Sequence, residues 1–291
     1  MTRVVVTGGS GKVGRATVRE LVEHGYEVIN LDQAAPRERM GHFLPIDLTD
    51  YGQVFEALTD IDGGWRGVDA VVHLAAIPGP SSAANAHLFQ NNSASSFNVF
   101  WAARKAGIRN IVWASSETLL GVPFETPPPY LPIDEEYPVR PETAYALAKA
   151  LDEEMARQFC RWDPELKMIG LRFSWVKEPA EYADFAATRA DPSRQTWNFW
   201  SYVDSRDCAQ AARLALESPV RGFEAFVIAA ADTVMTEPNA ELLARYGAGI
   251  PMKRAVEPNE SLLSSDKARR ILGYEPRHSW RTEAATPATA G

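Results

Sequence analysis

The sequence predicts an α/β fold, a doubly wound parallel sheet with a small C-terminal lobe. Short β-branched runs alternate with helical patterns over the first two thirds of the 291 residues, which is typical of strands joined by crossover helices. Most of these runs are continuously apolar, as strands are when helices cover both sheet faces. The chain also opens with a strand, a glycine-rich turn and a helix in direct succession.

The strands and helices follow one another at a regular pace. The predicted strands are RVVVTG (3–8), YEVINLD (26–32), FLPIDL (43–48), DAVVHLA (69–75), NIVWASS (110–116) and MIGLRFS (168–174). The predicted helices cover 12–24, 52–60, 84–106, 142–162 and 206–218. A late strand, AFVIAA (225–230), is expected to rejoin the sheet.

Two segments interrupt this rhythm. Residues 121–141 are rich in proline, which predicts an ordered surface loop beside the strand that ends at 116. Residues 175–201 contain three tryptophans together with prolines and charges, which fits either a lid or pocket wall or a satellite hydrophobic cluster.

These breaks suggest a domain division. A cofactor-binding domain is expected over 1–174, with 202–231 returning to it. A small substrate lobe is expected over 175–201 and 232–280, and a disordered tail over 281–291.

Composition excludes several classes of function. The formal net charge is −8 and no long basic run occurs, so nucleic acid is not an expected partner. The apolar runs are too short to cross a bilayer, and the chain opens directly into a strand, so we expect a cytoplasmic protein without a membrane partner. Cys160 and Cys208 lie far apart in helical patterns, which predicts no disulfide framework. The five histidines show no ligand spacing, so no metal site is expected.

The turn TGGSGKVG carries the first functional signal. Gly8, Gly11 and Gly14 are spaced three apart between the first strand and its helix, where glycines let the backbone approach a pyrophosphate. The next strand ends in Asp32, and an acid there binds the adenosine ribose and repels a 2′-phosphate. The pattern indicates a Rossmann-type site that prefers NAD, while the nearby arginines of the stretch 37–39 keep NADP open.

Further motifs, in the same order along the chain, resemble the extended short-chain dehydrogenase/reductase family of NAD-dependent epimerases and dehydratases. TGGSGKVG is similar to its TGxxGxxG loop, and YALAK to its YxxxK signature. PIDLTD, VVHLAA, NNSASSFNVFWAARKAG and SLLSSDKARRILGYEPRHSW resemble its other conserved stretches.

The resemblance implies a set of NAD-binding positions. These positions would contact the pyrophosphate, the adenine-side ribose, the adenine and the middle of the cofactor. They are Gly8, Gly11, Lys12, Val13, Gly14, Asp32, Asp47, Leu48, Leu74, Ala75, Ala76 and Asn92, and Tyr145 and Lys149 would lie at the nicotinamide end. Asn92 would reach toward the cofactor from the start of its helix. Taken alone, Asp47 could equally cap a helix that begins near Thr49.

The helix containing TAYALAKALDEE supplies the expected chemistry. Tyr145 and Lys149 are four apart and share a helix face. A phenol titrates near pH 10 in water, but a neighbouring cation and a positive nicotinamide ring favour the phenolate, as a general base requires. The resemblance makes Ser116 the third catalytic residue, which holds the reacting oxygen, and leaves Ser115 as a weaker candidate.

The substrate is less clearly indicated. Nucleotide-sugar epimerases carry an asparagine where RFSWVKEP has Trp175, which favours a free sugar or sugar acid over a nucleoside diphosphate. Ser116, Glu117 and Trp175 are the expected substrate contacts. The leading hypothesis is an NAD-dependent oxidoreductase or epimerase that acts on a secondary alcohol of a sugar or sugar derivative.

Two alternatives remain, and the oligomeric state adds a further expectation. One is a nucleotide-sugar 4-epimerase or dehydratase, and the other is a non-catalytic dinucleotide-sensing protein of the same fold. The family resemblance also implies a homodimer formed by the helices over 84–106 and 142–162.

Overall fold

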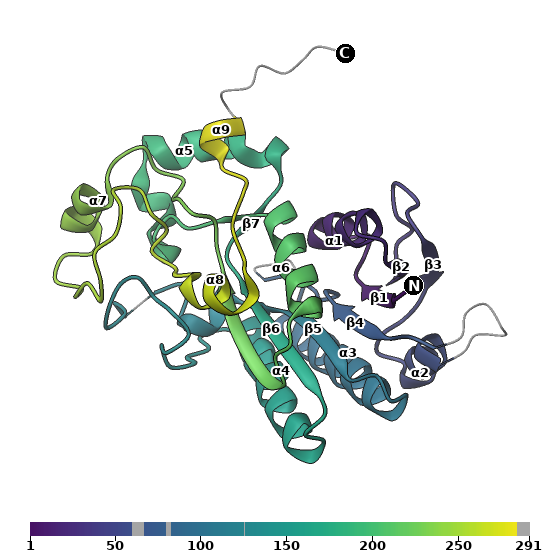
Figure 1. The fold of residues 1–291 in the computed structure, drawn as a ribbon. Coiled ribbons are helices and arrows are strands. Elements are labelled where there is room, and N and C mark those ends of the chain that lie inside the picture. Colours follow the sequence, from purple (N-terminus) through teal and green to yellow (C-terminus); the bar gives the residue numbers. More distant parts are fainter. Residues whose placement is uncertain (60–66, 80–82, 125, 284–291) are drawn as a thin grey trace, which may run out of the picture.

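A seven-stranded parallel sheet forms the centre of the computed structural model, which describes residues 1–59, 67–79, 83–124 and 126–283. Its strand order is β3-β2-β1-β4-β5-β6-β9, which confirms the predicted doubly wound α/β fold (Figure 1). The strands are β1 (Arg3–Thr7), β2 (Glu27–Asp32), β3 (His42–Pro45), β4 (Ala70–His73), β5 (Asn110–Ser116), β6 (Lys167–Phe173) and β9 (Gly222–Ile228).

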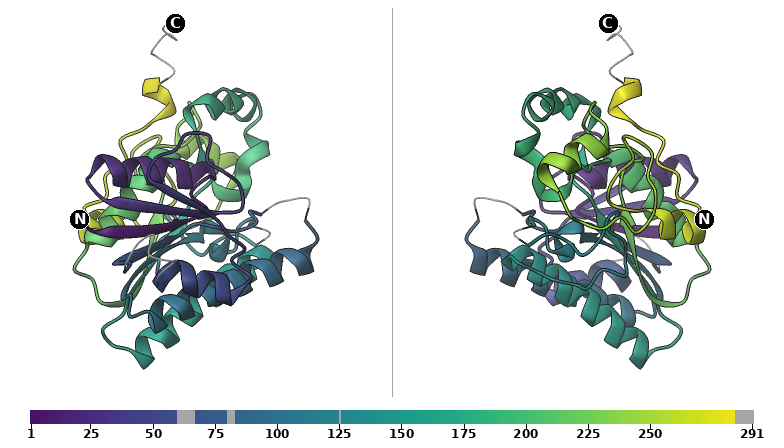
Figure 2. Two further views of the ribbon diagram at one scale, coloured as in Figure 1. Left: turned by 90° about the vertical axis from the view of Figure 1, so that its right-hand side faces the viewer. Right: turned by 90° about the vertical axis from the view of Figure 1, so that its left-hand side faces the viewer.

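Helices cover both faces of this sheet (Figure 2). One face packs against α1 (Lys12–Glu23), α6 (Ser205–Glu217) and α8 (Asp266–Leu272). The other packs against α2 (Tyr51–Thr59), α3 (Asn85–Lys105) and α4 (Ala144–Trp162). Strand residues such as Val4 and Val5 point alternately into the two layers and are fully buried, which explains why the strands are continuously apolar.

A third hydrophobic cluster, called the lobe below, contains residues from Leu120 to Trp280. It draws on η1 (Glu117–Leu120), η2 (Pro179–Asp184), α5 (Phe185–Ala190), α7 (Asn239–Tyr246), α9 (Trp280–Glu283) and the two aromatic residues that follow η3 (Pro192–Asn198). A two-stranded parallel sheet, β7 (Val176–Lys177) with β8 (Val203–Asp204), lies between this cluster and the main sheet's helices. Within 175–201, Trp200 is fully buried and its indole nitrogen donates to the Pro192 carbonyl at 2.8 Å, so this part of the segment is hydrophobic core.

The proline-rich loop after β5 differs from the predicted surface loop. Leu131 and Ile133 are fully buried in the lobe cluster. Their backbone N–H groups donate to the carbonyls of Pro251 and Leu262, each at 2.9 Å. The loop is tied to the C-terminal segment because its aliphatic side chains complete the core of the lobe.

The predicted tail begins later than expected. Arg281 belongs to α9, and its Nε donates to Asp232 at 2.9 Å, so the residues as far as 283 are anchored. Residues 284–291, the remainder of the predicted tail, lie outside the described residues. The division into a cofactor domain and a substrate lobe stays a prediction.

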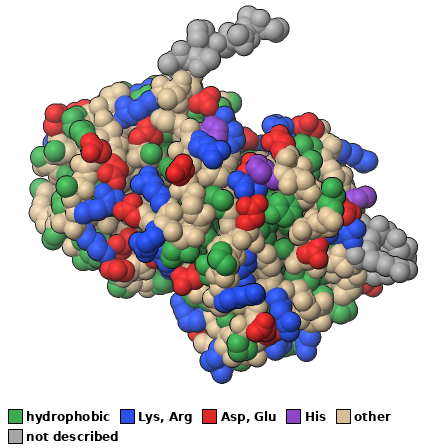
Figure 3. Space-filling view, in the orientation of Figure 1, with side chains coloured by type: hydrophobic (Ala, Val, Ile, Leu, Met, Phe, Trp, Pro, Cys, Tyr) green, Lys and Arg blue, Asp and Glu red, His purple; other side chains and the backbone are tan. Residues whose placement is uncertain are grey.

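Charge is distributed without a dominant sign on the visible face. Acidic and basic side chains are interspersed over most of it (Figure 3). Over the ranges that the structure describes, no helix is both long and apolar enough to cross a membrane.

Candidate cofactor and catalytic site

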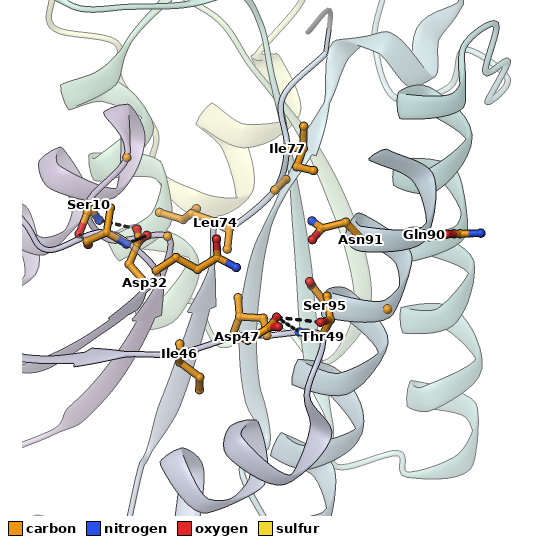
Figure 4. A pocket seen from close by; sticks show the side chains of 18 of the residues that line it. Ser10, Asp32, Ile46, Asp47, Thr49, Leu74, Ile77, Gln90, Asn91 and Ser95 are labelled. Atoms are coloured by element: carbon orange, nitrogen blue, oxygen red, sulfur yellow. Dashed lines mark hydrogen bonds between the residues drawn. The ribbon is translucent and has the colours of Figure 1, made fainter. Parts of the chain in front are cut away.

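A cavity of about 810 Å³ lies at the carboxyl edge of the sheet. The strand order reverses between β1 and β4, and ligands of open α/β sheets bind at such a point. Segments that follow β1, β2, β3 and β4 line the cavity together with α3 (Figure 4). The predicted residues among them are Gly8, Gly11, Asp32, Asp47, Leu48, Leu74, Ala75 and Ala76.

The glycine loop forms one end of this cavity. Gly8 has a φ of 69°, and a β-carbon there would come within 2.6 Å of the Ala75 nitrogen. A β-carbon at Gly14 would overlap the Gly8 carbonyl oxygen, so α1 can approach the loop only because residue 14 is glycine. No side chain of the described residues caps the N-terminus of α1 at Gly11. The first N–H groups of α1 therefore favour an anion, and the cradle fits a pyrophosphate.

Asp32 lies beside the glycine loop at the end of β2 (Figure 4). Its carboxylate accepts hydrogen bonds from the backbone N–H groups of Ser10 and Ala34, each at 3.0 Å. The Ser10 hydroxyl donates to the Ala34 carbonyl at 2.6 Å. These contacts fix the carboxylate at the cavity, where it can accept from ribose hydroxyls.

Asp47 lines the cavity from the segment after β3, the strand that pairs with β2. It accepts from the Thr49 nitrogen at 2.9 Å and hydroxyl at 2.7 Å, forming a local turn (Figure 4). The N-terminus of α2 is capped instead by Asp50, which accepts from the Gly52 nitrogen at 2.8 Å. Asp47 therefore shapes the cavity wall and does not cap α2.

Asn92 lies beside the loop that follows β4. It lies in the third turn of α3, because the helix begins at Asn85. Its amide accepts from the Ile77 nitrogen at 2.8 Å and donates to the Ile77 carbonyl at 2.9 Å. Asn92 is thus committed to holding the loop after β4.

Lys12 also has an engaged side chain. Its Nζ contacts both carboxylate oxygens of Glu181 at 2.7 Å, while Arg15 pairs with Glu178 at 2.8 Å. The side chains of Lys12 and Val13 do not line the cavity. These two residues can therefore contribute only their backbone N–H groups, in the first turn of α1, to ligand binding.

The loop after β4 joins the cavity to the predicted catalytic pair. Leu74 and Ile77 line the cavity, and Gly79 lies against the ring of Tyr145. Two residues of chain span at most about 7 Å, so Tyr145 is adjacent to the end of the cavity that Ile77 borders.

Helix α4 presents Tyr145 and Lys149 from its first two turns. Thr143 caps the helix by accepting from the Ala146 nitrogen at 3.0 Å. Lys149 is buried, with its Nζ 5.9 Å from the centroid of the Tyr145 ring. The same ammonium donates to the Ala114 carbonyl on β5 at 2.6 Å, which fixes the cation beneath the tyrosine.

The two serines at the end of β5 face different partners. Ser115 donates to Glu153 at 2.7 Å, and Glu153 forms a buried ion pair with Arg172 at 2.8 Å. The Ser116 oxygen accepts from the nitrogen and hydroxyl of Thr118, at 3.2 and 2.9 Å, which leaves its own proton available for donation. Adjacent strand residues point to opposite faces of the sheet. The Ser115 hydroxyl is therefore used in its hydrogen bond to α4, whereas the Ser116 hydroxyl can still donate to a substrate.

Glu117 is not placed as a substrate contact would be. Its carboxyl group is buried in the lobe and accepts from the Ser174 hydroxyl at 2.8 Å and the Asn198 amide at 3.2 Å. Burial raises the pKa of Glu117 to about 8, although both hydrogen bonds favour the carboxylate. The side chain therefore links the end of β5 to η3 instead of facing open space.

Trp175 lies in an aromatic group at the start of the lobe. The Lys177 ammonium sits 3.9 Å from the centre of its ring system, and Trp197 and Phe185 are 6.1 and 6.0 Å away. Lys177 thus covers one face of the partly exposed indole, and the remaining ring surface is apolar, whereas an asparagine at this position would offer hydrogen bonds.

Three further residues around Tyr145 and Lys149 carried no sequence motif. Gly79 contacts the tyrosine ring, Asp152 lies beside the lysine, and His73 is buried between Thr7 and Ser96. A glycine in a loop and single polar residues in apolar runs are too common to be informative. Only the three-residue spacing from Lys149 to Asp152, which places both on one helix face, could have indicated that Asp152 lies near the lysine.

A family model describing the NAD dependent epimerase/dehydratase family matches residues 4–191. L-arabinose 1-dehydrogenase (NAD(P)(+)) of Haloferax volcanii is 29% identical over 227 residues, which cover 75% of this chain and 84% of that protein. UDP-glucose 4-epimerase of Bacillus subtilis is 31% identical over 58% of this chain, and the alignment spans about half of the epimerase (51%).

Solved structures extend the likeness to nearly the whole chain. A UDP-galactose 4-epimerase superposes with a TM-score of 0.70 and 27% identity, covering 97% of this chain and 96% of the other. A mutated uronate dehydrogenase has a TM-score of 0.67 at 21% identity over 99% of this chain and 87% of its own length, which is a likeness of fold.

Proposed function

Because the chain belongs to the NAD-dependent epimerase/dehydratase family, we propose that it is an NAD-dependent oxidoreductase or epimerase of the extended short-chain dehydrogenase type. Its substrate is a secondary alcohol of a sugar or sugar derivative. The observation that carries this proposal is the adjacency of the cavity to Tyr145, beneath which Lys149 is fixed as a buried cation.

We infer that NAD binds in this cavity. Gly8, Gly11 and the first turn of α1 would hold the pyrophosphate, and Asp32 the adenine-side ribose. Asp47 and Leu48 would border the adenine, and Leu74 to Ala76 the middle of the cofactor. When bound, NAD supplies the hydride acceptor or donor for the reaction.

The protein's own residues would move the proton. Tyr145 accepts the proton of the substrate hydroxyl, and the Lys149 ammonium stabilises the phenolate that this requires. Ser116 donates its free proton to the substrate oxygen and fixes its direction. Lys149 is held by Ala114, so its charge is in place before the substrate binds.

We favour a free sugar or sugar acid over a nucleotide-sugar. Trp175 offers an aromatic face where nucleotide-sugar epimerases carry an asparagine, and such a face suits the C–H side of a sugar ring. The arabinose dehydrogenase is also matched over most of its length, whereas the epimerase of Bacillus subtilis is matched over about half.

The alternative is a nucleotide-sugar 4-epimerase, favoured by the 31% identity with that epimerase. A third possibility is a non-catalytic dinucleotide sensor of the same fold. The presence of all three catalytic residue types, at Ser116, Tyr145 and Lys149, argues against it. A cytoplasmic location remains the prediction from the sequence.

Turnover distinguishes these readings. Free sugars, uronates and UDP-sugars are each incubated with the protein and NAD, and both NADH absorbance and the sugar products are measured. We expect net NADH with a free sugar or sugar acid. Product without net NADH from a UDP-sugar would establish the epimerase instead, and no product from any of them would support the sensor.

Tyr145→Phe is the matched variant for this assay. Loss of the phenol should lower kcat by about 10²–10⁴, the usual contribution of general acid–base catalysis. A decrease below about tenfold would contradict the assigned base.

We also propose a homodimer. Helices α3 and α4 expose large apolar side chains side by side, and a four-helix bundle between two copies would cover them. The residues are Phe97, Leu147, Leu151 and Trp162, each 40–49% exposed.

A further inference from the structure

A buried carboxyl group lies one turn beyond Lys149 on α4. Asp152 has no exposed side-chain surface, and its Oδ2 is 3.7 Å from the Lys149 Nζ. Within the described part of the chain, Lys149 and Ser96 lie next to its carboxylate oxygens, and neither makes a hydrogen bond of good geometry with them. Aspartate is rarely buried so completely unless an opposite charge compensates it. The complete burial of Asp152 therefore indicates that it interacts with a nearby cation.

Helical geometry places Asp152 behind the catalytic pair. Tyr145, Lys149 and Asp152 are at positions i, i+4 and i+7, which lie on one face of α4. Lys149 is therefore between the tyrosine and the aspartate. Its ammonium is 2.6 Å from the Ala114 carbonyl oxygen, 5.9 Å from the centre of the Tyr145 ring and 3.7 Å from the Asp152 carboxylate.

The other polar groups around Asp152 do not replace Lys149 as its partner. Ser96 of α3 lies beside the carboxyl group and contacts His73 of β4, Oγ to Nε2, at 3.3 Å. Burial and the Lys149 charge lower the pKa of His73 to about 3, so the imidazole is neutral. Glu153, the adjacent acid on α4, is engaged by Arg172 and Ser115.

Burial and the Lys149 charge act in opposite directions on the Asp152 carboxyl group. Burial raises its pKa to about 6, and the nearby Lys149 opposes this rise. When Asp152 is ionised, its buried carboxylate faces the buried Lys149 side chain 3.7 Å away.

We propose that Asp152 is a positioning residue that keeps Lys149 in its ammonium form and fixes it beneath Tyr145. The inference rests on the proposed function, because the ammonium matters through the phenolate that it stabilises. A buried cation without a counter-ion releases its proton more readily, so removal of the Asp152 charge should favour the neutral amine.

The direct test follows the Lys149 ε-carbon by NMR in protein carrying ¹³C-labelled lysine, without cofactor, with Lys149→Arg to assign the resonance. In Asp152→Asn, the pH midpoint at which Lys149 loses its proton should fall by about one unit or more. Glu154→Gln is the matched control, since Glu154 is a half-exposed acid of α4 whose carboxylate accepts from Arg157 and Gln158. In this variant the Lys149 midpoint should equal that of the wild type.

The wild-type protein provides a second test, which holds even if Asp152→Asn does not fold. Protonation of Asp152 should perturb the Lys149 resonance with a midpoint near pH 6. A flat resonance across that range, or an unchanged midpoint in Asp152→Asn, would overturn the role of Asp152.

Activity adds an independent readout. The alkaline limb of the pH profile of kcat should move to lower pH in Asp152→Asn, whereas a merely structural defect would lower kcat equally at every pH. If the wild type turns over no alcohol, the proposed function fails although the NMR shift can still be found. If turnover is normal and both the midpoint and the alkaline limb are unchanged, the inference about Asp152 alone fails.

Discussion

Gly79 and Tyr145 are in direct contact across two segments far apart in the sequence. A β-carbon at residue 79 would come within 2.8 Å of Cγ of Tyr145 and 2.9 Å of its Cβ. The loop that borders the cavity thus sets the position of the tyrosine ring, and only the absence of a side chain permits this packing.

Gly79→Ala should therefore impair catalysis by displacing the Tyr145 ring. We expect kcat to fall by about tenfold or more, because a shift of about 1 Å at a reacting group is costly. NAD affinity should change little, since Gly79 does not line the cavity. Steady-state kinetics and NAD titration measure the two effects.

The double variant Gly79→Ala/Tyr145→Phe is the control for that prediction. If Gly79 acts through the phenol, adding Gly79→Ala to Tyr145→Phe should cost no further activity. Additive losses in the two variants would mean that Gly79 has another role.

Asp32→Ala should weaken NAD more than NADP. The substitution removes the acceptor for the ribose hydroxyls and the charge that repels a 2′-phosphate. We expect Kd for NAD to rise by about tenfold or more and Kd for NADP to change less, as read by calorimetric titration of each cofactor. Asp32→Asn is a useful companion, because its amide oxygen can still accept from Ser10 or Ala34. Equal weakening of both cofactors by Asp32→Ala would contradict the ribose assignment.

Glu117 should make stability fall between pH 4.5 and about 8. Its pKa is raised from 4.5 to about 8 by burial, so the folded protein holds a proton that the unfolded chain releases in this range. Stability from this group is complete below pH 4.5 and is lost as the pH rises to about 8, by at most about 1.4 kcal/mol per pH unit.

Glu117→Gln should remove that slope, because the amide cannot ionise. Urea unfolding at several pH values should show the variant gaining stability relative to the wild type as the pH rises. Glu38→Gln, a change at an exposed acid, should leave the slope intact. Parallel curves for the wild type and Glu117→Gln would show that Glu117 is ionised like an ordinary glutamate.

Charges on the exposed face of α4 should dissociate the proposed dimer. Leu147→Glu/Leu151→Glu places two carboxylates where we expect the second copy to pack, and light scattering should then report a monomer. Met252→Glu, at a comparably exposed apolar residue outside α3 and α4, should leave the mass unchanged. A wild-type monomer at micromolar concentration would refute the dimer directly.

Much of the fold was predictable because its signals are local. Continuous apolar runs marked most strands of the main sheet, and helical periodicity marked the helices that cover it. The edge strand β3 is the exception, because its residues are exposed or half-buried. The errors lie where distant segments meet. Leu131 and Ile133 look like parts of a surface loop until the C-terminal segment that covers them is placed, and Arg281 looks like tail until Asp232 is found beside it.

The candidate site divides in the same way. The glycine loop, Asp32, Tyr145 and Lys149 follow from the sequence by itself, because spacing within one strand, turn or helix fixes which groups share a face or an end. Only the tertiary structure decided that Gly79 touches Tyr145, that Glu117 is buried against Asn198, and that Lys149 has the Ala114 carbonyl and Asp152 around it. These contacts depend on how α4, β5 and the loops pack in three dimensions, and burial, which sets the charge state of each group, exists only after that packing has formed.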